Sequence, residues 1–251
     1  MHGFTQYTPT RIIFGKETQK QVGELAKSLK ASKVFVVYGG GSVVRSGLLD
    51  EVTASLEEAG LEYMTVGGVK PNPRLSFARE AVKKSIEFGT DFVLAVGGGS
   101  VIDGAKAASV LIEKETSIRK YHNTGEKVPK KHLPLIAIPT TAGTGSEVTN
   151  VSVLTNRNQG IKAPIASESF YPQYAIVDPT LTWSMPADLT ASAGIDVLSH
   201  AVEGYWSRLH QPICDVLAVY AAKLVLTNIR TVYKDPNNQA AVSYTHLRAH
   251  E

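Results

Sequence analysis

The sequence contains a single cysteine, Cys214, among 251 residues. One thiol excludes an internal disulfide and any zinc cluster held by several cysteines. Residues 1–11 are polar and lack the apolar stretch of a signal peptide. No window of about 18 apolar residues, the length that spans a bilayer, is evident. We therefore expect a cytoplasmic protein with no membrane partner.

An excess of charge of one sign is also missing. The 26 Lys and Arg and the 23 Asp and Glu are spread along the chain, and the formal net charge is +3. Nucleic-acid-binding proteins use a basic stripe, which this sequence lacks, so we expect no nucleic acid partner. The hydrophobic content of 43% predicts a globular protein, and its partners are expected to be small molecules.

Helical and strand-like apolar patterns alternate over the first ~180 residues. Apolar residues recur at helical spacing from Glu17 to Lys30, and the run Lys33 to Tyr38 is typical of a strand buried on both faces. The alternation continues with helices over 48–60 and 77–89, each closed by a glycine, and strands over 61–66 and 91–96. Parallel strands need crossover helices, so the fold class is α/β, with a Rossmann-like nucleotide-binding domain over residues 1–184.

The pattern changes after Pro179. Segments 189–206 and 213–229 are long helical patterns with no strand between them, so an all-helical domain is expected over residues 185–240. Two helices expose more apolar surface than they can cover, so we expect this domain to be incomplete. Residues 241–251 carry no helical stripe and are interpreted as a non-native tail.

A glycine-rich turn follows the predicted strand over 91–96. It consists of Gly97, Gly98, Gly99 and Ser100. Glycine lets backbone amides approach a pyrophosphate, and a helix beginning near Val101 adds the positive end of its dipole. We predict a phosphate-binding loop, although a bare tight turn fits the same residues. Asp103, in the first helical turn, is expected either to cap the helix or to accept hydrogen bonds from the cofactor.

A second loop, PTTAGTGSE (139–147), follows an apolar strand over 135–138. Its hydroxyl groups and free amides suit phosphate and ribose, so Thr140, Thr141 and Thr144 are candidate cofactor contacts. Standing alone, this segment would fit an ordinary Ser/Thr/Gly turn equally well.

A third loop ends the first long strand, where dinucleotide folds often meet the adenosine ribose. An acid at this place would bind the free 2′-hydroxyl of NAD and repel the 2′-phosphate of NADP. The loop has none, and Gly41 and Ser42 leave room for the phosphate. The sequence therefore favours NADP over NAD.

Asp196 and His200 are four residues apart on a predicted helix, so both side chains lie on one face and can bind one ion. A carboxylate and an imidazole suit iron, zinc or manganese. An isolated pair at this spacing is more often a surface hydrogen bond. The neighbouring residues are small and apolar, so we expect the pair to face a packed interior, where buried charge favours a bound metal.

Together these motifs resemble the iron-containing (group III) alcohol dehydrogenases of the butanol dehydrogenase and lactaldehyde reductase type. The similarity covers about Thr8 to Asn237 and includes TPTRIIFGK, VGGGSVIDGAK, PTTAGTGSEVT, AIVDPTLTWSMP and GIDVLSHAVEGY in that order. It implies a Rossmann-like domain followed by a helical domain, NADP or NAD as cofactor, and Fe2+ or Zn2+ as metal. It also implies a homo-oligomer for the full-length protein.

The resemblance implies roles for single residues. Asp196 and His200 match two metal ligands, and two further histidines are expected from later helices beyond this chain. The residues that match cofactor contacts are Gly97 to Ser100, Thr140, Thr141 and Thr144, together with Asn72 and Lys162. No catalytic side chain beyond the metal ligands is implied.

The leading hypothesis is a metal-dependent oxidoreductase that transfers hydride between NAD(P) and a primary alcohol or diol and its aldehyde. A first alternative keeps the fold but changes the chemistry, as in relatives of dehydroquinate synthase and glycerol or glycerol phosphate dehydrogenase. A second alternative is that this chain, with two of four expected ligands, is a nucleotide-binding fragment without catalysis. The hydroxyl-rich loop followed by Asp196 and His200 favours the leading hypothesis over the first alternative.

Overall fold

The computed structural model describes residues 3–114, 120–235, 238 and 241. The chain divides into two compact units. The α/β unit comprises Pro9–Pro139 and Ser146–Asp178, and the helical unit comprises Met1–Thr8, Thr140–Gly145 and Pro179–Glu251. All but Ala241 of the segment interpreted as a non-native tail lies outside the described residues.

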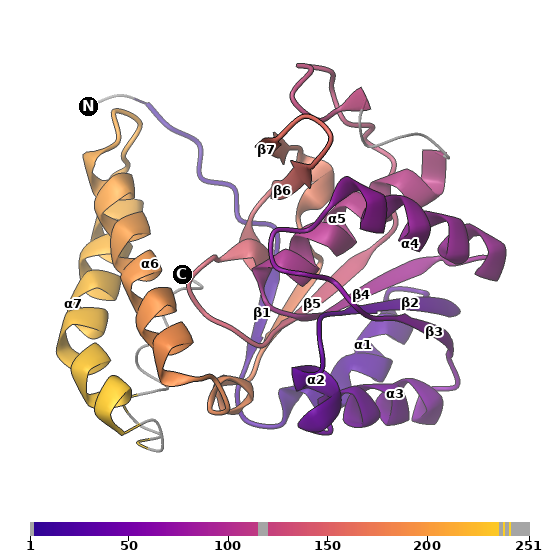
Figure 1. Ribbon diagram of the computed structural model, residues 1–251, viewed down its shortest axis with the longest axis horizontal. Helices are drawn as coiled ribbons and strands as arrows, with labels where there is room; N and C mark the ends of the chain where they lie inside the picture. The colour runs from indigo at the N-terminus through magenta and orange to yellow at the C-terminus, as the bar shows by residue number, and fades with distance from the viewer. Residues whose placement is uncertain (1–2, 115–119, 236–237, 239–240, 242–251) are drawn as a thin grey trace. The chain divides into compact units, whose positions relative to one another are not determined.

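The α/β unit is built on a six-stranded parallel sheet with the order β1-β8-β5-β4-β2-β3 (Figure 1). Its strands are β1 (Arg11–Phe14), β2 (Lys33–Tyr38), β3 (Glu62–Val66), β4 (Phe92–Gly97), β5 (Leu135–Pro139) and β8 (Tyr174–Val177). Every residue of β4 and β5 is buried, as expected for central strands covered on both faces. The predicted α/β fold class is thereby confirmed.

Helices connect and cover these strands. They are α1 (Val22–Ser28), α2 (Ser42–Arg45), α3 (Leu48–Glu58), α4 (Leu75–Phe88) and α5 (Gly99–Lys114), with short 3₁₀ helices over Thr18–Gln21, Ser146–Val148 and Glu168–Phe170. Helices α1 and α3 pack together on one side of the sheet, and α4 and α5 pack together on the other (Figure 1). A separate antiparallel hairpin, β6 (Val151–Asn156) and β7 (Ile161–Ala166), packs on α5 through β6.

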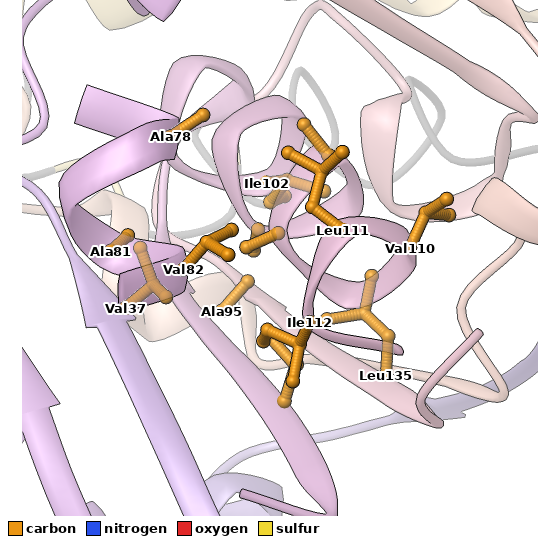
Figure 2. Packing of buried hydrophobic residues seen from close by; sticks show 14 of the residues in the cluster. Val37, Ala78, Ala81, Val82, Ala95, Ile102, Val110, Leu111, Ile112 and Leu135 are labelled. Carbon is orange, nitrogen blue, oxygen red and sulfur yellow. The ribbon is translucent and has the colours of Figure 1, made fainter. Parts of the chain in front are cut away.

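The main core of this unit lies between the sheet and the pair α4 and α5. Figure 2 shows side chains of the two helices directed at the strands, among them Ala81 and Val82 of α4, Ile102 and Leu111 of α5, and Ala95 of β4. Each large apolar side chain buried in this way contributes about 1.5–3 kcal/mol. The packing fixes α5, and therefore its first turn, against the end of β4.

The helical unit consists mainly of α6 (Ala187–Trp206) and α7 (Pro212–Lys234), after a 3₁₀ helix over Pro179–Thr182. The two helices bury Val197, Ala221 and Val225 between them. Many other apolar side chains of the pair stay exposed, as the sequence pattern predicts for two helices alone. The exposed ones are Leu189, Ile195, Tyr205, Trp206, Ile213, Val216, Val219, Tyr220, Leu226 and Tyr233, and Leu209 in the connection between the helices is exposed as well.

The sequence was expected to contain no segment long and apolar enough to span a membrane, and α7 does not meet this expectation. By length and composition it could cross one, and only 11% of its apolar window is buried. One such helix is weak evidence, because core helices of soluble proteins meet the same criterion. Charged residues also interrupt it, since Asp215, Lys223 and Arg230 lie along its length.

Candidate functional site

The strand order places a topological switch point between β2 and β4. From β2 the chain proceeds to β3 on one side, and from β4 it proceeds to β5 on the other. Tyr38 at the end of β2 pairs with Val96, next to Gly97 at the end of β4. Ligands of open α/β sheets bind outside the carboxyl ends of the strands at such a point. The first and third predicted loops both start there.

The loop after β4 requires glycine at its first position. Gly97 has φ of +154°, and a Cβ built on it would lie 2.6 Å from Cγ2 of Val101. Helix α5 begins at Gly99, two residues before the expected start, and the N–H of Val101 donates to the carbonyl of Gly98 at 2.8 Å. The first N–H groups of an α-helix have no partner within it, so this turn presents donors suited to an anion.

Asn72 lies beside the same loop. It adopts a left-handed conformation with φ of +57°, and its N–H donates to Oγ of Ser100 at 3.2 Å. The structure therefore brings together two predicted cofactor contacts that are 28 residues apart in the sequence.

The loop after β2 also borders the start of α5. A Cβ on Gly39 would lie 3.2 Å from Cγ2 of Val101, and the carbonyl of Gly39 accepts the N–H of Gly68 at 3.0 Å. Gly41 and Ser42 follow at the entrance of α2 and are exposed. Val101 is thus shared by the two glycine loops, which form one continuous edge of the α/β unit.

Asp103 was expected in the first turn of its helix, but the structure places it beyond that turn. It is the fifth residue of α5 and does not cap that helix. Its Oδ1 accepts the hydroxyl of Ser146, and its Oδ2 accepts the N–H of Val153 at 3.0 Å. Burial raises the pKa of Asp103, while Ser146, the charge of Lys106 and the Val153 amide oppose the rise. The capping prediction is wrong, and a cofactor contact would compete with two protein donors.

Lys106 was not singled out from the sequence, although a lysine three residues after an acid in an apolar helix is a signal for such a pair. Its side chain is completely buried. Its Nζ lies 2.8 Å from the carbonyl oxygen of Thr149, 2.9 Å from that of Val151 and 3.2 Å from Oγ of Ser146. Burial lowers its pKa to about 7, against the opposing charge of Asp103. This lysine ties α5 to the start of the hairpin.

Lys162, the remaining predicted contact of this unit, lies on β7 opposite Thr155 and is exposed. Its charge is one of the influences that lower the pKa of Asp103. Lys162 therefore belongs to the electrostatic surroundings of α5, although the hairpin that carries it was not identified from the sequence.

In the helical unit, the segment Thr140–Gly145 lies against α6. Gly143 has φ of +106°, and a Cβ there would lie 3.0 Å from the carbonyl oxygen of Ala193 and 3.4 Å from Oδ2 of Asp196. Only glycine permits this approach without strain. The predicted contacts Thr140 and Thr141 are half-buried in this segment, and Thr144 is exposed.

The pair on α6 has the geometry of a partial metal site. Nδ1 of His200 lies 3.1 Å from the carbonyl oxygen of Gly143 and 3.9 Å from Oδ2 of Asp196. A carbonyl can only accept, so Nδ1 carries the proton and Nε2 keeps its lone pair. Metal-ligating histidines are commonly oriented in this way by a backbone carbonyl. The donor set therefore fits a divalent ion such as Fe2+ or Zn2+.

The surroundings of this pair correct one expectation. The side chains of His200 and Asp196 are 53% and 46% exposed, so they do not face a packed interior. The reason is that α6 packs mainly on α7, and the pair lies away from the buried seam at Val197 and Ala221. Within the described residues, no cluster of three or more potential ligands surrounds the pair.

Comparison with known proteins identifies both halves of the chain. Residues 9–179 match the family model described as iron-containing alcohol dehydrogenase, and residues 190–249 match that of the Fe-containing alcohol dehydrogenase family, C-terminal. The second match extends into the segment interpreted as a non-native tail, and that interpretation stays a prediction.

The chain is 37% identical over 238 residues to sulfoacetaldehyde reductase of Bilophila wadsworthia, covering 95% of this chain and 61% of the relative. It is 36% identical over 228 residues to NADPH-dependent butanol dehydrogenase of Clostridium saccharobutylicum, covering 90% and 58%. The crystal structure of sulfoacetaldehyde reductase from Bifidobacterium kashiwanohense in complex with NAD+ superimposes with a TM-score of 0.94 at 40% identity, over 100% of this chain and 66% of that one. The chain thus spans about 60% of the length of these relatives.

Proposed function

Because the chain belongs to the iron-containing alcohol dehydrogenase family, we propose that the whole protein interconverts a small primary alcohol or diol and its aldehyde with NADP or NAD. The observation that carries this proposal is the orientation of His200, whose Nδ1 is held by the carbonyl of Gly143 beside Asp196. That arrangement leaves a ligand nitrogen available on the α6 face that also carries a carboxylate.

The cofactor role rests on the loops at the switch point. The amides around Gly97, Gly98, Gly99 and Ser100 would bind the pyrophosphate, with Asn72 supporting Ser100. Gly41 and Ser42 would lie at the adenosine ribose, and Lys162 would add positive charge. Thr140, Thr141 and Thr144 complete the proposed contacts. The relatives' names include both NADPH-dependent and NAD+-bound enzymes, so the proposal keeps both cofactors, with NADP preferred.

The metal role rests on Asp196 and His200. A bound Fe2+ or Zn2+ would supply Lewis-acid polarisation of the substrate's hydroxyl or carbonyl group, and the nicotinamide would donate or accept hydride. Gly143 orients the imidazole, and Asp196 supplies the negative charge. Two further histidine ligands are proposed to come from chain that the longer relatives possess.

The proposal extends to location and assembly. We propose a cytoplasmic homo-oligomer with no nucleic acid or membrane partner. Strand β1 supports self-association, because it forms one edge of the sheet and exposes Ile12 and Phe14. Apolar side chains on an edge strand favour pairing with another chain.

One observation favours the narrower function of a nucleotide-binding module for this chain by itself. Asp196 and His200 are half exposed, and the described residues hold no third ligand near them. Two ligands rarely hold a divalent ion tightly, since structural and catalytic sites use three or four protein ligands.

Titration calorimetry with NADP+ and NAD+, beside metal analysis of the purified chain, tests both functions. We expect nucleotide binding with substoichiometric metal and no turnover of butanol or butanal. Gly97→Ala is the variant that should abolish nucleotide binding, and Gly60→Ala, at another glycine with positive φ but with open space around its Cβ position, is the matched control. Absence of nucleotide binding by the unaltered chain would remove the proposed cofactor site.

A further inference from the structure

Arg45 is the last residue of α2, and its side chain folds back over the loop that follows β2. A Cβ on Gly41 would collide with Nη1 of its guanidinium. The backbone N–H of Arg45 donates to the backbone carbonyl of Gly41 at 2.9 Å, so one helical turn joins the two residues. The guanidinium therefore lies directly over the backbone at Gly41.

The guanidinium has no charged or hydrogen-bonding partner among the described residues. Within the part of the chain that the structure describes, Arg45 makes no ion pair and no side-chain hydrogen bond. Between Tyr38 and Leu49 the sequence contains no acid, and Asp50 is the first one after the loop. A positive charge with five donors thus faces solvent beside a glycine loop.

The switch point relates this charge to the proposed cofactor. Neighbouring parallel strands are about 4.8 Å apart, and β2 is the neighbour of β4. A dinucleotide whose pyrophosphate lies on the loop after β4 therefore has its adenosine ribose near the loop after β2. Any 2′-substituent of that ribose would lie near Gly41 and the guanidinium.

The geometry points to Arg45 as the residue that selects a 2′-phosphorylated cofactor, binding the phosphate while Gly41 leaves room for it; this inference rests on the proposed nucleotide site. An arginine binds a phosphate through two parallel N–H···O hydrogen bonds, which a neutral 2′-hydroxyl cannot match. The hydroxyl of Ser42, at the start of α2, is a second donor on the same loop.

The same geometry predicts that a side chain at position 41 changes the choice of cofactor. An aspartate at position 41 would have its Cβ where Nη1 now lies, so the guanidinium would move aside and would then pair with the neighbouring carboxylate. That pair would neutralise Arg45 and offer acceptors to a 2′-hydroxyl. Gly41→Asp should therefore act through Arg45 as well as by direct repulsion of a phosphate.

The test is titration calorimetry of the 251-residue chain with adenosine 2′,5′-bisphosphate and 5′-AMP, which share all groups except the 2′-phosphate. We expect the unaltered chain to bind the bisphosphate about tenfold more tightly. Arg45→Gln should remove that preference and leave 5′-AMP binding unchanged, and Arg45→Lys should retain part of it. Arg79→Gln, which removes an exposed arginine from α4, is the control and should change neither affinity.

Each other outcome overturns the inference. An unchanged preference in Arg45→Gln would show that another group binds the phosphate. Equal weakening of both ligands, with an intact circular dichroism spectrum, would show that Arg45 only supports the loop. Tight binding of 5′-AMP without any preference in the unaltered chain would remove the role of Arg45 but keep the nucleotide site. Failure to bind either ligand would overturn the nucleotide site and Arg45 together.

Discussion

The imidazole of His200 and the backbone carbonyl of Gly143 lie 3.1 Å apart, although 57 residues separate them in the sequence. This contact sets the ring's tautomer, because the carbonyl requires a proton on Nδ1. The nitrogen that can bind a metal is therefore chosen by a glycine in a loop and not by the neighbouring carboxylate.

Gly143→Ala is predicted to disturb this tautomer. A Cβ at this residue would meet the carbonyl oxygen of Ala193 at 3.0 Å, and φ of +106° is strained for alanine. The loop should move and release His200, so Zn2+ affinity should fall about tenfold. Proton and nitrogen NMR of the histidine rings during a Zn2+ titration measures both effects.

Gly160→Ala is the control, since that glycine also has positive φ, +66°, but nothing lies near its Cβ position. A His200 ring in Gly143→Ala that keeps the Nδ1–H tautomer and its Zn2+ affinity would contradict the assignment.

Gly97→Ala is predicted to destabilise the α/β unit. The added Cβ would lie 2.6 Å from Cγ2 of Val101, and the backbone angle disfavours alanine. Strain of this kind costs about 2–4 kcal/mol of unfolding free energy. Urea denaturation followed by circular dichroism measures the loss, and Gly40→Ala should change the free energy by less than about 1 kcal/mol. Equal midpoints for the two variants would show that the loop relaxes without cost.

Stability should depend on pH through Lys106. Burial lowers its pKa from 10.5 to about 7, so between these values the unfolded chain holds a proton that the folded chain lacks. The unfolding free energy therefore rises with pH across this window, by up to about 1.4 kcal/mol per pH unit from this group. Below pH 7 both states are protonated, and the penalty is fully present and constant.

The comparison of Lys106→Met with Lys83→Met, an exposed lysine on α4, tests this dependence. Urea unfolding at pH 7, 8 and 9 should show the slope in the control and its loss in Lys106→Met, whatever the absolute stability of each. An identical slope in both variants would mean that Lys106 keeps its ordinary pKa in the folded chain.

The outer face of α7 is predicted to cause self-association without contributing to stability. Leu226 is 63% exposed, whereas its neighbour Val225 is 1% exposed. Leu226→Lys should change the unfolding free energy by less than about 0.5 kcal/mol. Val225→Ser should cost about 2–3 kcal/mol, because it creates a cavity and buries a hydroxyl. Light scattering during size-exclusion chromatography should show fewer large species for Leu226→Lys, and an unchanged profile would contradict this prediction.

Periodicity and glycine placement predicted most of the α/β unit. Lys33 to Tyr38 is a strand with the predicted bounds, and Gly60 and Gly89 end their helices with φ of +72° and +76°. These features are local, since each depends on a few neighbouring residues. The bonding of Asp103 is not local, because its partners Ser146 and Val153 are more than 40 residues away.

The prediction that Asp196 and His200 are buried was wrong for a related reason. Small apolar neighbours in the sequence indicate that a helix can be packed closely, but not which face of it is covered. Asp196 and His200 lie on a face that the described residues leave half exposed. The orientation of His200 by Gly143 likewise depends on a loop whose position no helical pattern encodes.

The grouping of Thr140–Gly145 with the helical unit has a consequence for how the chain is made. This loop is translated about 50 residues before Ala193, whose backbone its Gly143 approaches. All strands of the sheet precede α6 in the sequence, so during synthesis the sheet can form before α6, which this loop contacts, has left the ribosome. A chimera that exchanges only α6 and α7 would therefore combine foreign helices with the original residues 1–8 and 140–145, which belong to the same unit but are encoded upstream.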